Sequence, residues 1–289
     1  MEGPNTRALA DHLNDVITGR PVEQILVPEH RWQANMLLLN CVGQVVQRVR
    51  SHGKWLFFDF SHGVTWLCQL ITKSKCFLSP ADEPSASAQG SGSGVQGGRR
   101  GTSKAVPLLT VHFRGVWGGR SPQVMTLTGR PIFYILPTEL AFKHAEIRLL
   151  GPDPLSSATF HDDFPYRIRQ HPHATVAACL LNQEVVAGLG NLLKCEILYS
   201  TRFSPALKVG ALLASQVDFL AGTIVGICAT ASTFAHNQQP FPYRIYDRAG
   251  LPCNICQTEI VVDRSAMDGH LTWYCPTCQP VGKEPMLFR

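Results

Sequence analysis

The segment Cys253-Asn-Ile-Cys256, followed after 18 residues by Cys275-Pro-Thr-Cys278, decides the fold of the last part of this chain. A two-residue gap lets one tight turn present two thiolates, and zinc takes four ligands at the corners of a tetrahedron. The residues between the pairs include two strand-like runs, 258–263 and 271–274, which predict a hairpin that brings the pairs together. We therefore predict a structural zinc site, because four thiolates leave no position open for water. Two disulfides in a secreted domain are the alternative.

The composition favours the zinc interpretation and an intracellular protein. The other six cysteines lie scattered in apolar segments without any pairing rhythm, as small buried residues do in a reducing compartment; they are Cys41, Cys68, Cys76, Cys179, Cys195 and Cys228. No signal peptide and no run of 18 uncharged apolar residues is evident, so we expect no membrane association. A net charge of +5 permits a nucleic-acid partner without requiring one.

The first half of the chain predicts β structure after one helix. Residues 6–18 fit an amphipathic helix, and strand-like runs follow at 42–49, 55–60, 64–70, 108–113, 123–128 and 132–136. Residues 80–105 are dominated by Ser, Gly, Ala and Gln, which predicts a flexible insertion. We expect a β-sandwich or barrel with one N-terminal helix.

The second half predicts helices, at 175–181, 191–201 and 207–230, with a tight turn at 187–190 between the first two. The fold class is therefore α+β, with a cleft between the two halves. We predict three domains: residues 1–150, which are a β-sandwich; residues 151–240, which are helical; and residues 241–289, which hold the zinc element.

Four motifs occur in the order and spacing of one known family. The stretch Val186-Ala-Gly-Leu-Gly-Asn-Leu-Leu-Lys-Cys-Glu-Ile-Leu-Tyr199 resembles the helix–two-turn–helix of formamidopyrimidine-DNA glycosylase and endonuclease VIII. The start Met1-Glu-Gly-Pro4, the turn His52-Gly-Lys-Trp55 and the terminal Tyr-Cys-Pro-Thr-Cys-Gln resemble three further motifs of these base-excision repair enzymes. The resemblance spans nearly the whole chain and leans toward the endonuclease VIII branch. It implies damaged DNA as the partner and a structural zinc finger.

The resemblance also implies the residues that contact DNA. Gly188 and Gly190 permit a tight turn that opens a helix, and Asn191 matches a residue that contacts phosphates. A plain helix–helix turn with an Asn cap is the alternative for this local pattern. Gln69 matches a DNA-contacting glutamine of endonuclease VIII, and Leu70 or Ile71 would wedge into the gap left by an extruded base, although either is more often a core residue.

Two further residues match the family's acid–base groups. Glu2 matches the carboxylate that protonates the sugar O4′ or moves protons during imine formation. Lys54 matches a lysine that contacts phosphates and transfers protons, whereas a solvated turn lysine is its alternative.

The chain departs from the family at its nucleophile, which is the secondary amine of an N-terminal proline. Here Met1 stands directly before Glu2-Gly-Pro4, and the large Glu2 side chain predicts that Met1 is retained. An α-amine has a pKa of about 8, so part of it is neutral near pH 7 and can form a Schiff base at C1′. We therefore predict Met1 as the nucleophile. A gene start that omits a proline codon is the alternative.

The finger departs from the family as well. Many members carry an arginine five residues before the third cysteine, and His270 holds that position here. Histidine still donates a hydrogen bond, but its charge depends on pH and the bidentate grip of arginine is lost. A solvated turn histidine is the alternative, and Arg264 is a possible substitute in the same hairpin.

We therefore expect a base-excision DNA glycosylase with abasic-site lyase activity, acting as a monomer. Its expected catalytic residues are Met1, Glu2, Lys54 and His270, and its expected substrates are damaged bases in DNA, oxidised bases in particular. We expect it in the cytoplasm or nucleoid of a bacterium or in the nucleus of a eukaryote. The alternative is a catalytically impaired DNA- or RNA-binding zinc protein of the same fold.

Overall fold

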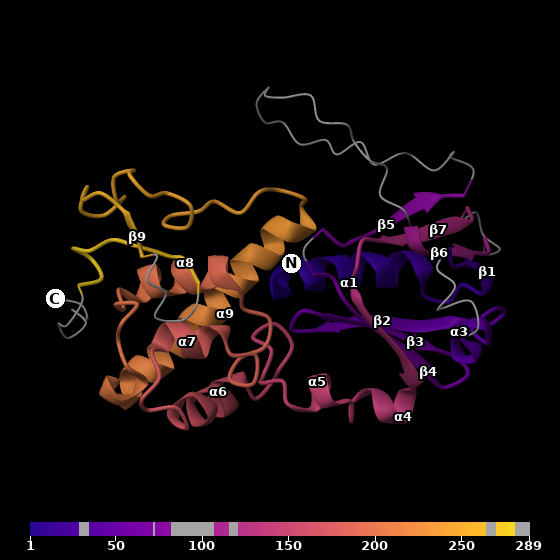
Figure 1. Ribbon diagram of the computed structural model, residues 1–289, viewed down its shortest axis with the longest axis horizontal. Helices are drawn as coiled ribbons and strands as arrows, with labels where there is room; N and C mark the ends of the chain where they lie inside the picture. Colours follow the sequence, from indigo (N-terminus) through magenta and orange to yellow (C-terminus); the bar gives the residue numbers. More distant parts are fainter. Residues whose placement is uncertain (29–34, 72, 82–106, 116–120, 264–269, 281–289) are drawn as a thin grey trace. The chain divides into compact units, whose positions relative to one another are not determined.

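The computed structural model describes residues 1–28, 35–71, 73–81, 107–115, 121–263 and 270–280 (Figure 1). The chain divides into two compact units. Unit 1 comprises Met1–Ala10, Ser51–Trp55 and Lys143–Arg289, and unit 2 comprises Asp11–Arg50 and Leu56–Phe142. Two short N-terminal segments therefore group with the C-terminal half of the sequence. The predicted domain limits at residues 150 and 240 stay predictions.

Unit 2 is a β-sandwich. One sheet has the strand order β1-β6-β7-β5 and the other the order β2-β3-β4-β8. The strands are β1 (Val22–Leu26), β2 (Val46–His52), β3 (Trp55–Phe60), β4 (Val64–Gln69), β5 (Lys75–Pro80), β6 (Pro107–Phe113), β7 (Gln123–Thr128) and β8 (Ile132–Pro137). The pairs β1–β6, β6–β7, β5–β7 and β4–β8 are antiparallel. The predicted sandwich is confirmed.

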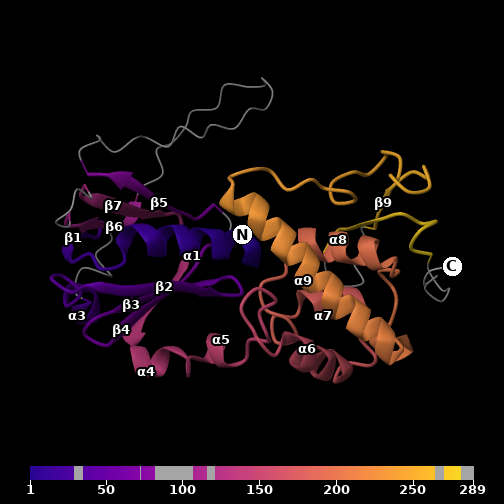
Figure 2. The ribbon, with the colours of Figure 1, turned by 180° about the vertical axis from the view of Figure 1, so that it is seen from behind.

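The second half of helix α1 (Gly3–Ile17) lies between the two sheets in both views (Figures 1 and 2). Leu13 and Ile17, four residues apart on the helix, are fully buried. Trp66 on β4 lies in an aromatic cluster, with its ring centroid 4.5 Å from that of Phe60 and 5.7 Å from that of Phe133. Burial of these side chains stabilises the sandwich by about 25 cal/mol for each Å² of apolar surface removed from water.

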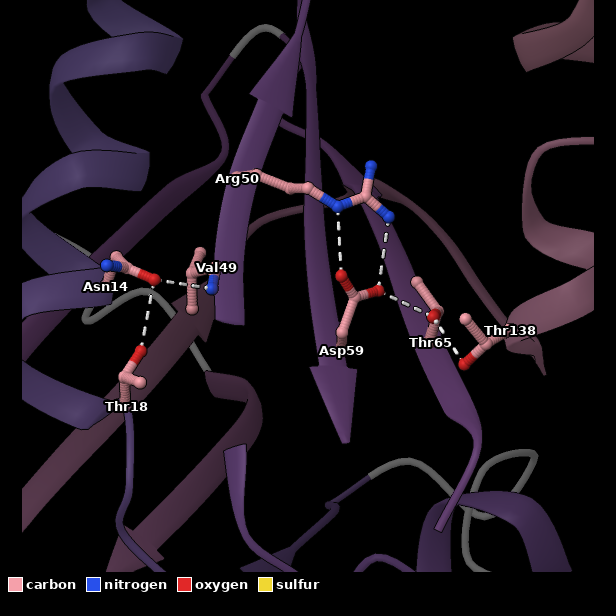
Figure 3. A network of polar contacts seen from close by, with 7 residues as sticks. All are labelled: Asn14, Thr18, Val49, Arg50, Asp59, Thr65 and Thr138. Carbon is pink, nitrogen blue, oxygen red and sulfur yellow. Dashed lines mark hydrogen bonds and ion pairs between the residues drawn. The ribbon is translucent and has the colours of Figure 1, made fainter. Parts of the chain in front are cut away.

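A polar network ties four segments of unit 2 together (Figure 3). The Arg50 guanidinium donates two hydrogen bonds to Asp59, at 2.9 and 3.2 Å, and lies over the rings of Phe57 and Phe142. The Thr65 hydroxyl donates to Asp59 at 2.7 Å. The Thr65 hydroxyl also lies 2.9 Å from the Thr138 hydroxyl, so the network joins β2, β3, β4 and the segment that begins at Thr138.

The helices of unit 1 pack around a separate core. They are α5 (Ala145–Arg148), α6 (Phe160–Arg169), α7 (Val176–Leu181), α8 (Asn191–Thr201), the short 3-10 helix η1 (Val209–Ala211) and α9 (Ala214–His236). Two more short helices, α3 (Met36–Leu39) and α4 (Thr138–Ala141), belong to unit 2. The core takes buried side chains from α6, α7, α8 and α9, including the α6 residues Phe160, Phe164 and Ile168 at four-residue spacing.

Helix α9 is long and apolar enough to cross a membrane by length and composition alone. The core helix of a soluble protein meets the same criterion, and α9 contributes Val217, Leu220, Ile224 and Cys228 to the core of unit 1. The length and apolar composition of α9 are therefore weak evidence that it crosses a membrane.

The C-terminal element is a two-stranded antiparallel hairpin of β9 (Val261–Asp263) and β10 (Thr272–Tyr274). It packs on α8 through a small buried cluster formed by Cys195 and Tyr199 of the helix, Ile245 of the segment before the finger, and Cys253, Ile260 and Cys275 of the finger. The predicted hairpin between the two cysteine pairs is confirmed, although its strands are shorter than the apolar runs.

Candidate functional site

Three glycine backbones meet in unit 1 and set the frame of the site. The Gly3 N–H donates to the Gly188 carbonyl at 2.7 Å. A Cβ on Gly3 would lie 3.0 Å from Gly188 Cα, and a Cβ on Gly53 would lie 3.0 Å from Gly188 N and 2.9 Å from Ala187 Cβ. Side chains at these positions would separate the segments, so glycine is required for the N-terminus, the Lys54 turn and the turn before α8 to touch.

The turn before α8 depends on Gln183, which the sequence analysis did not identify. Its Oε1 accepts the Gly188 N–H at 3.0 Å, and its Nε2 donates to the carbonyls of Leu181 and Leu189, both at 3.0 Å. Gly188 has φ of +96°, a conformation that side chains disfavour. The glutamine therefore holds the strained turn in a single shape.

The turn that carries Lys54 depends on Asp153, also missed from the sequence. Asp153 Oδ2 accepts the Gly53 N–H at 2.7 Å, while Oδ1 accepts the Leu155 N–H at 2.8 Å. The His52 ring contacts the Gly151 carbonyl at 3.1 Å. These partners are about 100 residues away along the chain, which is why no local pattern reveals them.

Glu2 places its carboxylate on the N-terminus of α8. Oε1 accepts the Leu192 N–H at 3.0 Å, and Oε2 accepts the Leu193 N–H at 3.2 Å. A Cβ on Gly190 would lie 2.6 Å from Glu2 Cδ, so Gly190 makes room for the carboxylate. Orphan N–H groups and the helix dipole both favour a negative charge at this point.

The N–H groups of Leu192 and Leu193 at the start of α8 are occupied by Glu2. The predicted DNA contacts of Gly188, Gly190 and Asn191 at this turn stay predictions. The group at this helix end is the chain's own carboxyl, and the helix N–H groups fix the position of Glu2 and lower its pKa against the larger effect of burial.

Glu2 and Lys54 have shifted proton affinities. Burial raises the pKa of Glu2, and the N–H groups of α8 and the Lys54 charge oppose that rise only in part. Burial lowers the pKa of Lys54, against the attraction of Glu2. A carboxyl group that keeps its proton more readily and an amine that loses it more readily are suited to act as general acid and base.

A cavity of about 190 Å³ lies beside Glu2. Its walls include Pro4 and Asn5 of α1, Leu193 of α8, Phe234 of α9, and Phe241 and Tyr243 of the segment after α9. Apolar and aromatic walls with a few polar groups are typical of sites that bind small molecules. Met1, one residue before Glu2 in the sequence, has 44% of its surface exposed.

Asn191 contacts the finger hairpin. Its Nδ2 donates to the Leu271 carbonyl at 2.8 Å, and its Oδ1 is buried without a hydrogen-bond partner among the described residues. Lys194, one turn further along α8, is fully buried and donates to Thr272 Oγ1 at 2.7 Å. The Thr272 hydroxyl in turn lies 3.2 Å from the carbonyl of the exposed His270. The first turn of α8 thus holds the hairpin segment that carries His270.

Glu196 anchors the segment that leads into the finger. It is fully buried, and its Oε1 accepts the N–H groups of Arg244, Ile245 and Tyr246, each at 3.0 Å. The Arg244 guanidinium lies 3.5 Å from Oε2. A run of three N–H donors on one carboxylate needs a charged acceptor, which the periodicity of α8 did not predict.

The four predicted cysteine ligands converge. The Sγ atoms of Cys253, Cys256, Cys275 and Cys278 all lie within 4.8 Å of one another. Tetrahedral zinc–thiolate bonds of about 2.3 Å place sulfur atoms about 3.8 Å apart, and the observed separations include 3.4, 3.5 and 3.9 Å. These distances are far longer than a disulfide bond, and all ten cysteines are free. The disulfide alternative is excluded, and the thiolates fit a tetrahedral metal ion.

The remaining expected residues lie elsewhere. Gln69 ends β4 in unit 2, where Leu70 is buried and Ile71 is 42% exposed. Their contacts with DNA stay predictions. Arg264 and residues 82–105 of the expected insertion lie outside the described residues.

The comparisons with known proteins agree with these features. Residues 150–237 match the family described as the formamidopyrimidine-DNA glycosylase H2TH domain. The chain is 26% identical to formamidopyrimidine-DNA glycosylase of Dinoroseobacter shibae over 96% of its own length and 99% of that protein. It is also 26% identical to endonuclease 8 of Klebsiella pneumoniae, with the same shares covered.

The fold likewise matches a solved structure, that of Lactococcus lactis formamidopyrimidine-DNA glycosylase bound non-covalently to DNA containing an abasic site. The TM-score is 0.76 at 21% identity, covering 97% of this chain and 100% of that one. Relatives named for both branches match at the same identity, so the branch stays open. Residues 150–237 belong to the H2TH domain family, and the relatives of nearly full length support membership of the formamidopyrimidine-DNA glycosylase and endonuclease VIII family.

Proposed function

We propose that this protein is a base-excision DNA glycosylase with abasic-site lyase activity. The observation that carries the proposal is the Glu2 carboxylate, which α8 holds beside Lys54 and one residue after the N-terminal amine. An acid, a base and a nucleophilic amine at one point are the groups that Schiff-base chemistry at a sugar requires.

In the first step, the Met1 α-amine attacks C1′ of the damaged nucleotide and the glycosidic bond breaks. The bonding electrons leave with the base, which takes up a proton. Glu2 in its protonated form then protonates O4′, so that the sugar ring opens and a Schiff base links C1′ to Met1. The raised pKa of Glu2 keeps more of this acid available near neutral pH.

In the lyase step, a proton leaves C2′ and the 3′ phosphate departs from C3′. Lys54 assists this β-elimination, because its lowered pKa lets the amine exchange protons while its charged form attracts phosphate. Water then hydrolyses the Schiff base and regenerates the amine. We place Asn191 and His270 of unit 1 near the DNA phosphates, with Gly188 and Gly190 as further DNA contacts in that unit. Gln69 of unit 2 is a separate proposed contact with DNA.

Chemistry at C1′ requires that the damaged base be taken out of the helix stack. The cavity beside Glu2, with Asn5 at its rim and Phe241 and Tyr243 in its wall, is the site that we assign to the extruded base. The proposed substrates are damaged DNA bases, which we expect to be oxidised. We also propose that the protein is of the endonuclease VIII type.

Zinc is the ion that we assign to the four cysteines, in a structural role. Cys253, Cys256, Cys275 and Cys278 would hold it, and with four thiolate ligands it supplies folding energy rather than a reactive water. The protein would act as a monomer in the compartment that contains the genome.

A base-release and strand-cleavage assay tests the proposal on duplexes that carry an oxidised pyrimidine, an oxidised purine or an abasic site. The variant Glu2→Gln should lower base release and cleavage about 100-fold or more, because the acid is removed. The matched control is Glu23→Gln, at an exposed carboxylate in unit 2 that pairs with Arg114. Equal activity of Glu2→Gln and the wild type would refute the assigned role of Glu2.

A DNA- or RNA-binding protein without catalysis is the second candidate, because Met1 stands in the place of the family's proline and His270 in the place of the arginine. This alternative requires tight, salt-sensitive DNA binding with no base release and no strand cleavage on any of the three duplexes.

A further inference from the structure

Tyr199 of α8 reaches the metal-binding cysteines from outside the finger. Its hydroxyl oxygen lies 3.2 Å from Cys253 Sγ, and both residues are almost completely buried, with exposed fractions of 2% and 0%. The two residues are 54 positions apart in the sequence, in a helix and in the turn before β9. Both lie in the small cluster that packs the finger on α8.

The chemistry of the pair fixes the direction of the hydrogen bond once a metal is bound. A metal-bound thiolate carries no proton, whereas a tyrosine hydroxyl keeps its proton at neutral pH. The hydroxyl therefore donates to sulfur. The Arg244 guanidinium lies 5.8 Å from the centroid of the Tyr199 ring, and a cation beside the ring makes the hydroxyl a better donor.

The Cys253 sulfur also accepts a backbone hydrogen bond from its own turn. The Ile255 N–H points to Cys253 Sγ at 3.4 Å, as the Cys278 N–H does to Cys275 Sγ. These backbone bonds form with the cysteine turns themselves. Tyr199 differs because it belongs to a helix whose first turn binds Glu2 and whose residues Leu193, Ile197 and Leu198 pack in the helical core of unit 1.

We infer that Tyr199 is an outer-sphere ligand of the metal centre, which donates its hydroxyl to the Cys253 thiolate and slows the loss of the metal. Donation withdraws negative charge from the sulfur, so that Cys253 is a weaker target for protons and oxidants that would release it from the metal. Retention of the metal then depends on α8 as well as on the finger. This inference rests on the metal centre assigned above, but not on the glycosylase activity.

The first test compares metal release from the purified full-length wild type, Tyr199→Phe and Tyr166→Phe. Tyr166 of α6 is 69% exposed, so its variant controls for the loss of a tyrosine hydroxyl. After the zinc content has been measured by mass spectrometry, each protein is mixed with a chromophoric chelator at neutral pH. Tyr199→Phe should release zinc about 10-fold faster than the other two proteins. Circular dichroism checks that the phenylalanine variant keeps its helices.

The second test separates the hydrogen bond from packing. In the cobalt(II)-substituted proteins, the sulfur-to-cobalt charge-transfer band reports the electron density on the thiolates. A thiolate that loses its hydrogen bond gives up an electron more easily, so the band of Tyr199→Phe should move to longer wavelength. The band of Tyr166→Phe should match that of the wild type.

Each outcome decides the inference. Faster zinc release with a shifted cobalt band supports it. Faster release with an unchanged band would assign the effect to packing and overturn it, as would wild-type behaviour in both tests. A wild-type protein that binds neither zinc nor cobalt would overturn the metal centre itself, while base release by the same preparation would leave the proposed activity standing.

Discussion

At the residue scale, Glu2 caps α8 and is also the residue that we propose as the acid. Two N–H groups of α8 bind the carboxylate, yet burial outweighs them and raises its pKa above the ordinary value of 4.5. A buried carboxylate with a raised pKa is less costly to the fold when it carries a proton. Burial of the ionised Glu2 carboxylate therefore lowers the stability of the folded protein.

This pKa shift has a consequence for stability against pH. Between pH 4.5 and the raised pKa, the folded protein binds more protons at Glu2 than the unfolded chain does, so stability falls as pH rises through that window. The free energy of unfolding of the wild type relative to Glu2→Gln should decrease from pH 4.5 upward and then level off. Urea unfolding of both proteins across this range measures it, and a difference that rises or stays flat would contradict the assigned burial of Glu2.

Gly190 gives a second prediction at this scale. The variant Gly190→Ala should push the Glu2 carboxylate off α8, because a Cβ there would lie 2.6 Å from Glu2 Cδ, and base release should fall about 100-fold. The control is Gly222→Ala on α9, where a Cβ meets nothing within 4 Å and should stabilise the helix by about 0.5–1 kcal/mol. Full activity of Gly190→Ala would show that the position of Glu2 is not critical.

The sequence predicts some of these residues and not others. Glu2, Lys54 and Asn191 follow from the resemblance, and the cysteine ligands follow from spacing alone. Gln183 and Asp153 do not follow from the sequence, because each acts by holding the backbone of a turn. The Gly53 N–H that Asp153 binds at the Lys54 turn lies 100 residues away along the chain. The capping of α8 by Glu2 joins residues 190 positions apart, so no local pattern encodes it.

At the scale of elements, α8 connects the Glu2 carboxylate, which we propose as the acid, with the finger. Its first turn binds Glu2 and the hairpin, and the next turns hold the segment before the finger and Cys253. A helix that serves so many partners is buried on nearly all sides, as the exposure of residues 193–199 confirms. Its weak amphipathic pattern follows from that burial.

Lys194 carries the prediction for this element. In Lys194→Met the side chain keeps its length but Thr272 loses its donor, so we expect a loss of about 1–3 kcal/mol in stability. The hairpin with His270 should become less well placed, which should raise KM for DNA more than it lowers kcat. Steady-state kinetics measure KM and kcat separately. Lys208→Met, at an exposed lysine before η1, is the control. An unchanged KM would show that Lys194 does not position the hairpin.

The elements themselves were predicted unevenly. β3 and β7 match their predicted limits, because their apolar runs end at clear turns. β1 and β5 were missed, since β5 is half exposed with weak alternation, and α6 was missed although Phe160, Phe164 and Ile168 carry its period. The helix expected at 207–230 is instead the short η1 followed by α9, which runs to His236.

At the scale of the whole molecule, unit 1 gathers the candidate acid, base and finger from three separate stretches of the sequence. Its helical core and the cluster beneath the finger are distinct sets of residues. Removal of the metal should therefore disorder the finger while the helical core remains folded.

This separation gives a prediction for the metal-free protein. A strong chelator should weaken DNA binding and shift the fluorescence of Trp273, whose ring packs 4.6 Å from that of Tyr246, while the helical circular dichroism is largely kept. Added zinc should restore both signals. Loss of all helical signal on chelation would contradict the independence of the two cores.

The central claim is that the N-terminal amine beside Glu2 forms the Schiff base. Borohydride trapping of the intact protein on abasic-site DNA, followed by mass spectrometry of the cross-linked peptide, tests it most directly. We expect the reduced adduct on the α-amine of Met1, and its loss when that amine is acetylated. An adduct on a lysine such as Lys54 would contradict Met1 as the nucleophile, and the absence of any adduct would contradict the lyase mechanism.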